Sequence, residues 1–324
     1  MRKLMAVSML VLVVVAGFSQ TRFGWVDSRS DDPDRMLPGV NPAKVEGAVV
    51  TAGSSTVYPL SVVITENFRK DGYKGNISID SIGSGGGFER FGKGEIDISN
   101  ASSKIKQAQL DAAAAANKGK VLEFVVGTDA LSVVVSKKNT FAKELTTKEL
   151  AIAFSTAEYW SDVRSGFPKK EIIRYSPGTD SGTFEYFVEH VFKKDKKPLL
   201  SAKNMNLSED DNVLVQGVAG NEYAIGYFGY AYFDENKTKV TAIAVDGVAP
   251  SIASINAKQY SLARPLYLYS TDSILQAKPQ VAAFIAYYLS NVNRLIRKAG
   301  YFPASAEALK AGKQLWLEAV KGSY

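Results

Sequence analysis

Short strand patterns alternate with helix patterns along most of the chain. A β-branched run at 49–51 leads into a helical pattern over 59–70, whose apolar residues recur on one face. The alternating strand pattern at 77–82 is likewise followed by a glycine cluster and a helix pattern. Repeated strand–turn–helix units predict an α/β protein with a mainly parallel sheet that helices cover.

The later part of the chain continues this alternation. An apolar stretch over 121–135 is interrupted at 127–129, so it fits either two consecutive strands or one long strand that passes between domains. We also expect a helix over 145–154, a strand over 172–175, an amphipathic helix over 280–295 and a final helix over 305–320 that Ser305 caps. Because 324 residues are too many for one ordinary core, they suit two domains or one large split domain.

The N-terminal residues fit a cleavable signal peptide. Arg2 and Lys3 precede an apolar run over 4–15, and small residues follow through Ser19. This run is shorter than the roughly 20 residues that cross a bilayer. We therefore predict that residues 1–19 direct export and are removed, and the lack of an Ala-x-Ala sequence leaves an uncleaved anchor as the alternative.

Residues 20–46 have the composition of a flexible tether. Charged residues alternate with prolines in this segment, and we expect few of its side chains to enter a core. The folded part is predicted to begin at Gly47.

Composition excludes several kinds of chemistry. The chain has no cysteine, and therefore no disulfide, no thiolate nucleophile and no lipobox cysteine for a lipid anchor. His190 is the only histidine and no carboxylate cluster has metal-ligand spacing, so we predict no metal and no cofactor. The net charge of +6 is mild for this length, and the basic run at 193–197 contains no aromatic residue, so we expect no nucleic-acid partner.

Three turns rich in glycine and hydroxyl residues carry the candidate chemistry. Each follows a strand pattern and opens a helix pattern: Gly53-Ser54-Ser55-Thr56, Gly83-Ser84-Gly85-Gly86-Gly87 and Gly178-Thr179-Asp180-Ser181-Gly182-Thr183. Helix N-termini present unpaired amides and the positive end of the helix dipole, glycine permits close approach, and hydroxyls add donors. One such turn is ordinary helix capping, whereas three in one chain favour a convergent anion site.

These turns belong to motifs that resemble the periplasmic phosphate-binding proteins of the Pst-type ABC importer. Four short motifs occur in that family's order: Ala52-Gly53-Ser54-Ser55-Thr56-Val57-Tyr58-Pro59, Ile82-Gly83-Ser84-Gly85-Gly86-Gly87, Asp97-Ile98-Ser99-Asn100-Ala101-Ser102 and Asp180-Ser181-Gly182-Thr183-Phe184. Similar stretches at 145–163, 224–232 and 264–269 extend the resemblance over most of the chain after residue 47.

The resemblance implies a type II periplasmic-binding fold with two lobes, a hinge and a ligand in the cleft. Lobe one would comprise 47–131 and 261–324, and lobe two 132–260. The protein would be an extracytoplasmic monomer, not an enzyme, that captures inorganic phosphate for the membrane permease subunits of an ABC importer. The lobes would close over an ion held by hydroxyls and helix dipoles without a counter-cation.

The same resemblance implies a set of ligand-binding residues. Lobe one would contribute Ser55, Thr56, the Val57 backbone, Ser84 and Ser102. Lobe two would contribute Asp180, Ser181, Gly182 and Thr183.

Two positions depart from the family's pattern. Ser102 stands where the third motif ends in an aspartate that accepts the proton of hydrogen phosphate, and Pro177 stands in place of an arginine. Such a carboxylate rejects sulfate, because sulfate brings no proton and two acceptors would face each other. Asp180 is the candidate replacement for the aspartate, or alternatively only a helix N-cap. Arg174, three positions before Pro177, is a candidate replacement for the arginine.

Other functions are weighed against phosphate capture. Another oxyanion, such as sulfate or molybdate, stays open because of Ser102, and a secreted hydrolase that uses Ser181 is the alternative from a different class. A serine nucleophile needs a general base within hydrogen-bond reach, and His190 lies nine residues along the expected helix. The stretch at 87–94 resembles a P-loop but has Gly94 where Ser or Thr must hold magnesium.

Overall fold

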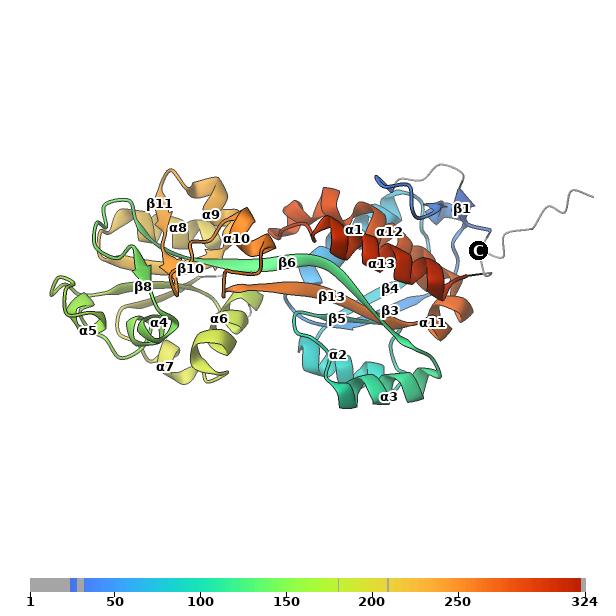
Figure 1. Cartoon of the computed structure of the whole chain (residues 1–324), viewed down its shortest axis with the longest axis horizontal. Helices are drawn as coiled ribbons and strands as arrows, with labels where there is room; N and C mark the ends of the chain where they lie inside the picture. The colour runs from blue at the N-terminus through green and yellow to red at the C-terminus, as the bar shows by residue number, and fades with distance from the viewer. Residues whose placement is uncertain (1–23, 28–31, 180, 209, 322–324) are drawn as a thin grey trace, which may run out of the picture.

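The computed structural model describes residues 24–27, 32–179, 181–208 and 210–321. The predicted signal peptide at 1–19 and Asp180 lie outside these residues. Two lobes lie side by side, joined by the strands β6 (Val121–Ser136) and β13 (Ala263–Thr271) (Figure 1). In the described part of the chain, no helix has both the length and the apolar character needed to cross a membrane.

One sheet runs through both lobes. Among the described residues its nine strands follow the order β4, β3, β5, β13, β6, β10, β8 and β9, and β11 also pairs with β6. Within each lobe the outer strands pair in parallel, as expected from strand–turn–helix units. These strands are β3 (Val49–Gly53), β4 (Ile77–Ser81), β5 (Ile98–Ala101), β8 (Ile173–Pro177), β9 (Met205–Ser208) and β10 (Ala224–Gly229), whereas β11 (Val240–Ala242) pairs antiparallel with β6.

Helices cover both faces of the sheet in lobe one. Figure 1 shows α1, α12 and α13 on one face and α2 and α3 on the other. The face of α1 that packs inward carries Leu60, Ile64 and Phe68, which recur every four residues and are fully buried. The helices of this lobe are α1 (Tyr58–Lys70), α2 (Gly83–Gly92), α3 (Gln107–Asn117), α11 (Asp272–Ala277), α12 (Pro279–Leu295), the 3₁₀ turn η2 (Ile296–Ala299) and α13 (Ala306–Ala319).

Lobe two follows the same plan with shorter helices. Its helices are α4 (Thr147–Ala153), α5 (Trp160–Val163), α6 (Gly182–Phe192), α7 (Lys197–Leu200), α8 (Asp211–Gly220), α9 (Tyr230–Asn236) and α10 (Ile252–Asn256). A small parallel pair, β7 (Glu144–Leu145) and β12 (Ala244–Val245), lies beside them.

The apolar stretch at 121–135 forms one long strand, not two. The first half of β6 pairs antiparallel with β13, and its second half pairs antiparallel with β10 in lobe two. A Cβ at Gly127 would overlap Ile296 Cδ1, so the strand can cross lobe one closely because this position has no side chain. The interruption at 127–129 lies between the last residue that this strand gives to the core of lobe one, Val126, and the first that it gives to the core of lobe two, Ala130.

Each lobe has its own core. Buried hydrophobic residues from 25–126 and 266–320 form one cluster, and those from 130–262 form the core of lobe two with a smaller cluster under α8. The predicted α/β architecture in two lobes is confirmed.

The prediction of a flexible tether over 20–46 is wrong for the described residues of that segment. Trp25, Leu37 and Val45 are buried in lobe one, and the segment forms β1 (Val26–Asp27), β2 (Gly39–Val40) and a 3₁₀ turn, η1 (Pro42–Lys44). Asp32 makes an ion pair with Lys313 of α13, and both side chains are fully buried. A few widely spaced apolar residues are therefore enough to attach this segment to lobe one, and the ion pair neutralises the buried charge of Asp32.

Candidate functional site

The three turns singled out in the sequence place helix N-termini at the cleft. Helices α1 and α2 begin without a side-chain cap, because their N-cap residues are Val57 and Ile82. Helix α6 is capped by Ser181, whose hydroxyl accepts a hydrogen bond of 3.2 Å from the Thr183 amide. Because the first amides of a helix have no partner within the helix, the starts of α1 and α2 can donate to an anion.

The first and fourth motifs meet across the cleft. A Cβ at Gly182 of lobe two would overlap Thr56 Oγ1 of lobe one, so glycine is required for this approach. The Ser55 hydroxyl donates to Glu185 Oε2 at 3.0 Å, which is a second contact between the lobes. The lobes are therefore closed on each other at these residues.

Four predicted site residues line one cavity. This cavity has a volume of about 340 Å³ and is lined by Ser55, Ser181, Gly182 and Thr183. The rest of its lining comes from both lobes: Tyr58, Pro59, Ser81, Asp211, Gly229, Tyr232, Ala299, Gly300 and Tyr301.

The remaining predicted residues of lobe one lie beside this cavity. Val57 is fully buried, and its amide donates a long hydrogen bond of 3.4 Å to Ser54 Oγ. Ser54 Oγ donates to Ser102 Oγ at 2.9 Å, and the Ser102 amide donates to Ser84 Oγ at 3.1 Å. Ser84 and Ser102 thus form a hydrogen-bonded serine cluster with Ser54, and neither lines the cavity.

Arg264, which the sequence analysis did not single out, lies at the centre of the contact. Its Nη2 donates to Thr56 Oγ1 at 2.8 Å and to the Gly182 carbonyl at 3.2 Å. Its side chain is 11% exposed, and its guanidinium carbon lies 4.0 Å from the centre of the Tyr186 ring. Arg264 is thus a cation at the contact between the first and fourth motifs, where the sequence analysis expected none. The available signal was a single arginine at the start of the buried strand 264–269.

The charge of Arg264 is balanced by carboxylates. Asp129 Oδ2 lies 3.3 Å from Arg264 Nε, and Glu189 Oε2 lies 3.8 Å from Nη1. Burial raises the pKa of Asp129, and the neighbouring guanidinium opposes that rise. Burial also raises the pKa of Tyr186, so the phenol stays neutral.

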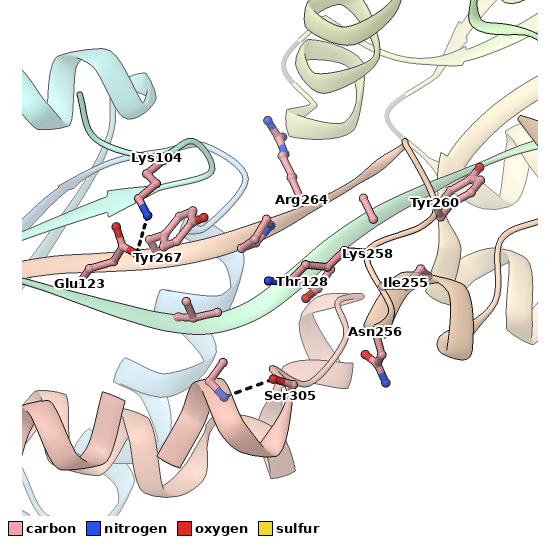
Figure 2. A pocket seen from close by; sticks show the side chains of 14 residues that line it. Lys104, Glu123, Thr128, Ile255, Asn256, Lys258, Tyr260, Arg264, Tyr267 and Ser305 are labelled. Carbon is pink, nitrogen blue, oxygen red and sulfur yellow. Dashed lines mark hydrogen bonds and ion pairs between the residues drawn. The ribbon is translucent and has the colours of Figure 1, made fainter. Parts of the chain in front are cut away.

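A second cavity of about 440 Å³ borders the hinge. It is lined by residues of both lobes, among them Lys104, Glu123, Thr128, Asn256 and Lys258. Figure 2 shows the Arg264 side chain extending away from Thr128, Asn256 and Lys258. Arg264 is itself among the residues that line this second cavity, and its Nη2 reaches from there to Thr56 Oγ1 and the Gly182 carbonyl.

Arg174 has a structural role. Its guanidinium is fully buried and donates to the carbonyls of Ala153 and Lys203, each at 2.6 Å, and to those of Ala157 and Ile172. Burial lowers its pKa to about 10. It does not replace the family's arginine at the anion, because these carbonyls hold it within lobe two.

His190 does not form a catalytic pair with Ser181. Ser181 caps α6 and His190 lies near the end of the same helix, about 13 Å farther along its axis. The imidazole is half-buried beside Tyr186, and burial lowers its pKa. The geometry of a serine hydrolase is absent from these residues.

The sequence is similar to those of known proteins over most of its length. The family model described as a PBP superfamily domain matches residues 39–292. Protein SphX of Synechococcus elongatus is 40% identical over 288 residues, which cover 85% of this chain and 83% of SphX. The phosphate-binding protein PstS of Staphylococcus saprophyticus is 37% identical over 268 residues, covering 80% of this chain and 81% of PstS.

The fold also matches a solved structure. The crystal structure of a possible phosphate binding protein from Planctomyces limnophilus superposes with a TM-score of 0.79 at 35% identity. The match covers 86% of this chain and 100% of that chain. The chain therefore belongs to the PBP superfamily and, within it, to the family of the phosphate-binding protein PstS, with the two-lobed type II fold.

Proposed function

We propose that this protein binds inorganic phosphate between its lobes and presents it to the membrane permease subunits of an ABC importer. The observation that carries the proposal is the convergence of the first and fourth motifs on one cavity, with Ser55 from lobe one and Ser181, Gly182 and Thr183 from lobe two. The relative from S. saprophyticus is named a phosphate-binding protein, which supports the same ligand here.

The hydroxyls at this contact are set up to donate. Thr56 Oγ1 accepts from Arg264 and Ser181 Oγ accepts from the Thr183 amide. A hydroxyl carries one proton, so each of these groups, once it has accepted from the protein, can donate that proton to an anion. The Val57 amide, Ser84, Ser102 and Thr183 complete the proposed set of donors, and the uncapped starts of α1 and α2 add the helix dipole.

Selectivity for phosphate over sulfate requires an acceptor for the ligand's proton. Asp180 remains the acceptor proposed from the sequence. Glu185 is a second candidate, because its Oε2 already accepts a hydrogen bond from Ser55. Sulfate has no proton near neutral pH, so a carboxylate at the ligand would leave two acceptors unpaired.

The rest of the mechanism follows from the two-lobed architecture. We propose that the lobes, 47–131 with 261–324 and 132–260, rotate about β6 and β13, and that the permease recognises the closed form. The protein would be exported by the segment at 1–19 and act outside the inner membrane as a monomeric binding protein, not an enzyme.

Calorimetric titration of the chain without residues 1–19 tests the proposal. We expect one phosphate to bind tightly and excess sulfate not to displace it. Thr56→Ala and Ser181→Ala should each weaken phosphate binding about tenfold or more, whereas Ser201→Ala, an exposed serine outside the cleft, should not. Wild-type affinity in both cleft variants would refute the proposed site.

The same samples separate the alternatives. Displacement of phosphate by sulfate or molybdate at equal concentration would assign the cleft to a different oxyanion. Turnover of a phosphate ester that Ser181→Ala abolishes would instead assign a hydrolase.

A further inference from the structure

Arg264 is anchored in the hinge rather than in either lobe. It faces Asp129 across the antiparallel pair β13 and β6, and Asp129 is 1% exposed. The remaining donors of the guanidinium point toward the cleft, where Nη2 reaches Thr56 of lobe one and Gly182 of lobe two. A single nitrogen thus contacts both lobes, which requires that they be closed.

The two contacts of Nη2 affect where the Thr56 hydroxyl can donate its proton. Thr56 Oγ1 has one proton, and when it accepts from Arg264 that proton must be donated elsewhere. The bond to the Gly182 carbonyl holds the first peptide of α6, and the N-terminus of a helix is a favourable place for an anion. The ion pair with Asp129 explains only the position of Nε. The contacts of Nη2 are separate from that pair, because they join Thr56 of the first motif and Gly182 of the fourth.

We propose that Arg264 is a positioning residue that directs the Thr56 hydroxyl toward the bound anion and does so only when the lobes close. The inference rests on the proposed function and adds to it the residue that links hinge and ligand. Pro177 stands where the family's arginine is expected, and in this chain an arginine of the hinge strand β13 contacts the first and fourth motifs instead.

A double-mutant cycle distinguishes this role from simple attraction between charges. Phosphate affinity is measured by calorimetry for the wild type, Arg264→Gln, Thr56→Val and the double variant. We expect Arg264→Gln to weaken binding about 10- to 100-fold in the wild type, as for loss of a charged hydrogen bond. In the Thr56→Val background, the factor by which Arg264→Gln weakens phosphate binding should be at least about fivefold smaller.

A control variant and a second version of the cycle complete the experiment. Lys258→Gln removes one positive charge from the second cavity and should bind phosphate like the wild type. If Arg264→Gln does not fold, the cycle is repeated with Asp129→Asn in every sample, which leaves no unpaired buried charge.

The outcomes separate the two proposals. Equal losses in both Thr56 backgrounds, or wild-type binding by Arg264→Gln, would overturn the role of Arg264 alone. Lack of phosphate binding by the wild-type protein would overturn the proposed function and, with it, this inference.

Discussion

Asp129 and Arg264 face each other across the two strands that join the lobes, with Arg264 Nε 3.3 Å from Asp129 Oδ2. Both side chains are nearly buried, so the low-polarity surroundings strengthen their attraction. Because the pair joins the two strands that connect the lobes, it holds the guanidinium beside both of them. Nη2 of Arg264 contacts Thr56 Oγ1 of lobe one and the Gly182 carbonyl of lobe two.

We predict that Glu185 contributes to rejection of sulfate. Glu185→Gln replaces an acceptor by a group that can donate to sulfate, so the ratio of sulfate to phosphate dissociation constants should fall about tenfold or more. Competition calorimetry measures this ratio. Glu318→Gln, at an exposed position of α13, whose residues do not line the cavity, is the matched control and should leave it unchanged. A lowered ratio in Asp180→Asn but not in Glu185→Gln would assign the role to Asp180.

Arg174 should contribute to stability and not to binding. Arg174→Met leaves four carbonyl groups without their donor inside lobe two. We expect the free energy of unfolding to fall by about 3 kcal/mol or more, since each unsatisfied buried group costs roughly 1–3 kcal/mol. Urea unfolding measures the change, and Lys203→Met, at an exposed ion pair, should alter it by less than about 1 kcal/mol. Weakened phosphate binding by the folded variant would contradict this assignment.

The sequence was sufficient for the architecture because the relevant signals are local. Strand patterns, glycine turns and apolar faces recur within a few residues, and they predicted β3, α1 and α13, the last with its cap Ser305. The choice between one strand and two at 121–135 was not local. It depended on pairing with β13 and β10, which lie far along the chain.

The same difference between local and distant signals explains why only part of the site was predicted. The glycine and hydroxyl residues of the site belong to short sequence motifs. The sequence alone therefore indicated four residues that line the cavity, Ser55, Ser181, Gly182 and Thr183. Arg264 could not, because its role comes from pairing with Asp129, 135 residues away, and from a closed arrangement of the lobes.

Residues near the N-terminus should stabilise lobe one. Asp32→Asn removes the buried partner of Lys313, so we expect a loss of about 3–5 kcal/mol in the free energy of unfolding. Asp34 also contacts Lys313, at 2.7 Å, but its side chain is 56% exposed. Asp34→Asn is therefore the matched control, with an expected loss below about 1 kcal/mol. Equal effects of the two substitutions in urea unfolding would show that burial of the Asp32 pair is not what stabilises the segment.

The free energy of unfolding should depend on pH through the ionisation of Glu149. Hydrogen bonds from Arg164, at 2.7 and 2.8 Å, lower the pKa of Glu149 to about 2, and hydrogen bonds from Thr146 add to the effect. The folded state thus favours the ionised carboxylate. Its contribution to stability is fully present above the unfolded pKa of about 4.3 and is lost as the pH falls toward 2.

The test compares the wild type with Glu149→Gln in urea at pH 7 and pH 3. At pH 7 the wild type should be the more stable protein, since glutamine offers Arg164 no charge. At pH 3 the unfolded chain gains a proton at Glu149 that the folded chain does not bind, so the difference between the two proteins should shrink. A difference that stays constant between the two pH values would mean that Arg164 interacts equally well with a neutral partner, and that the ion pair has no part in the acid stability of lobe two.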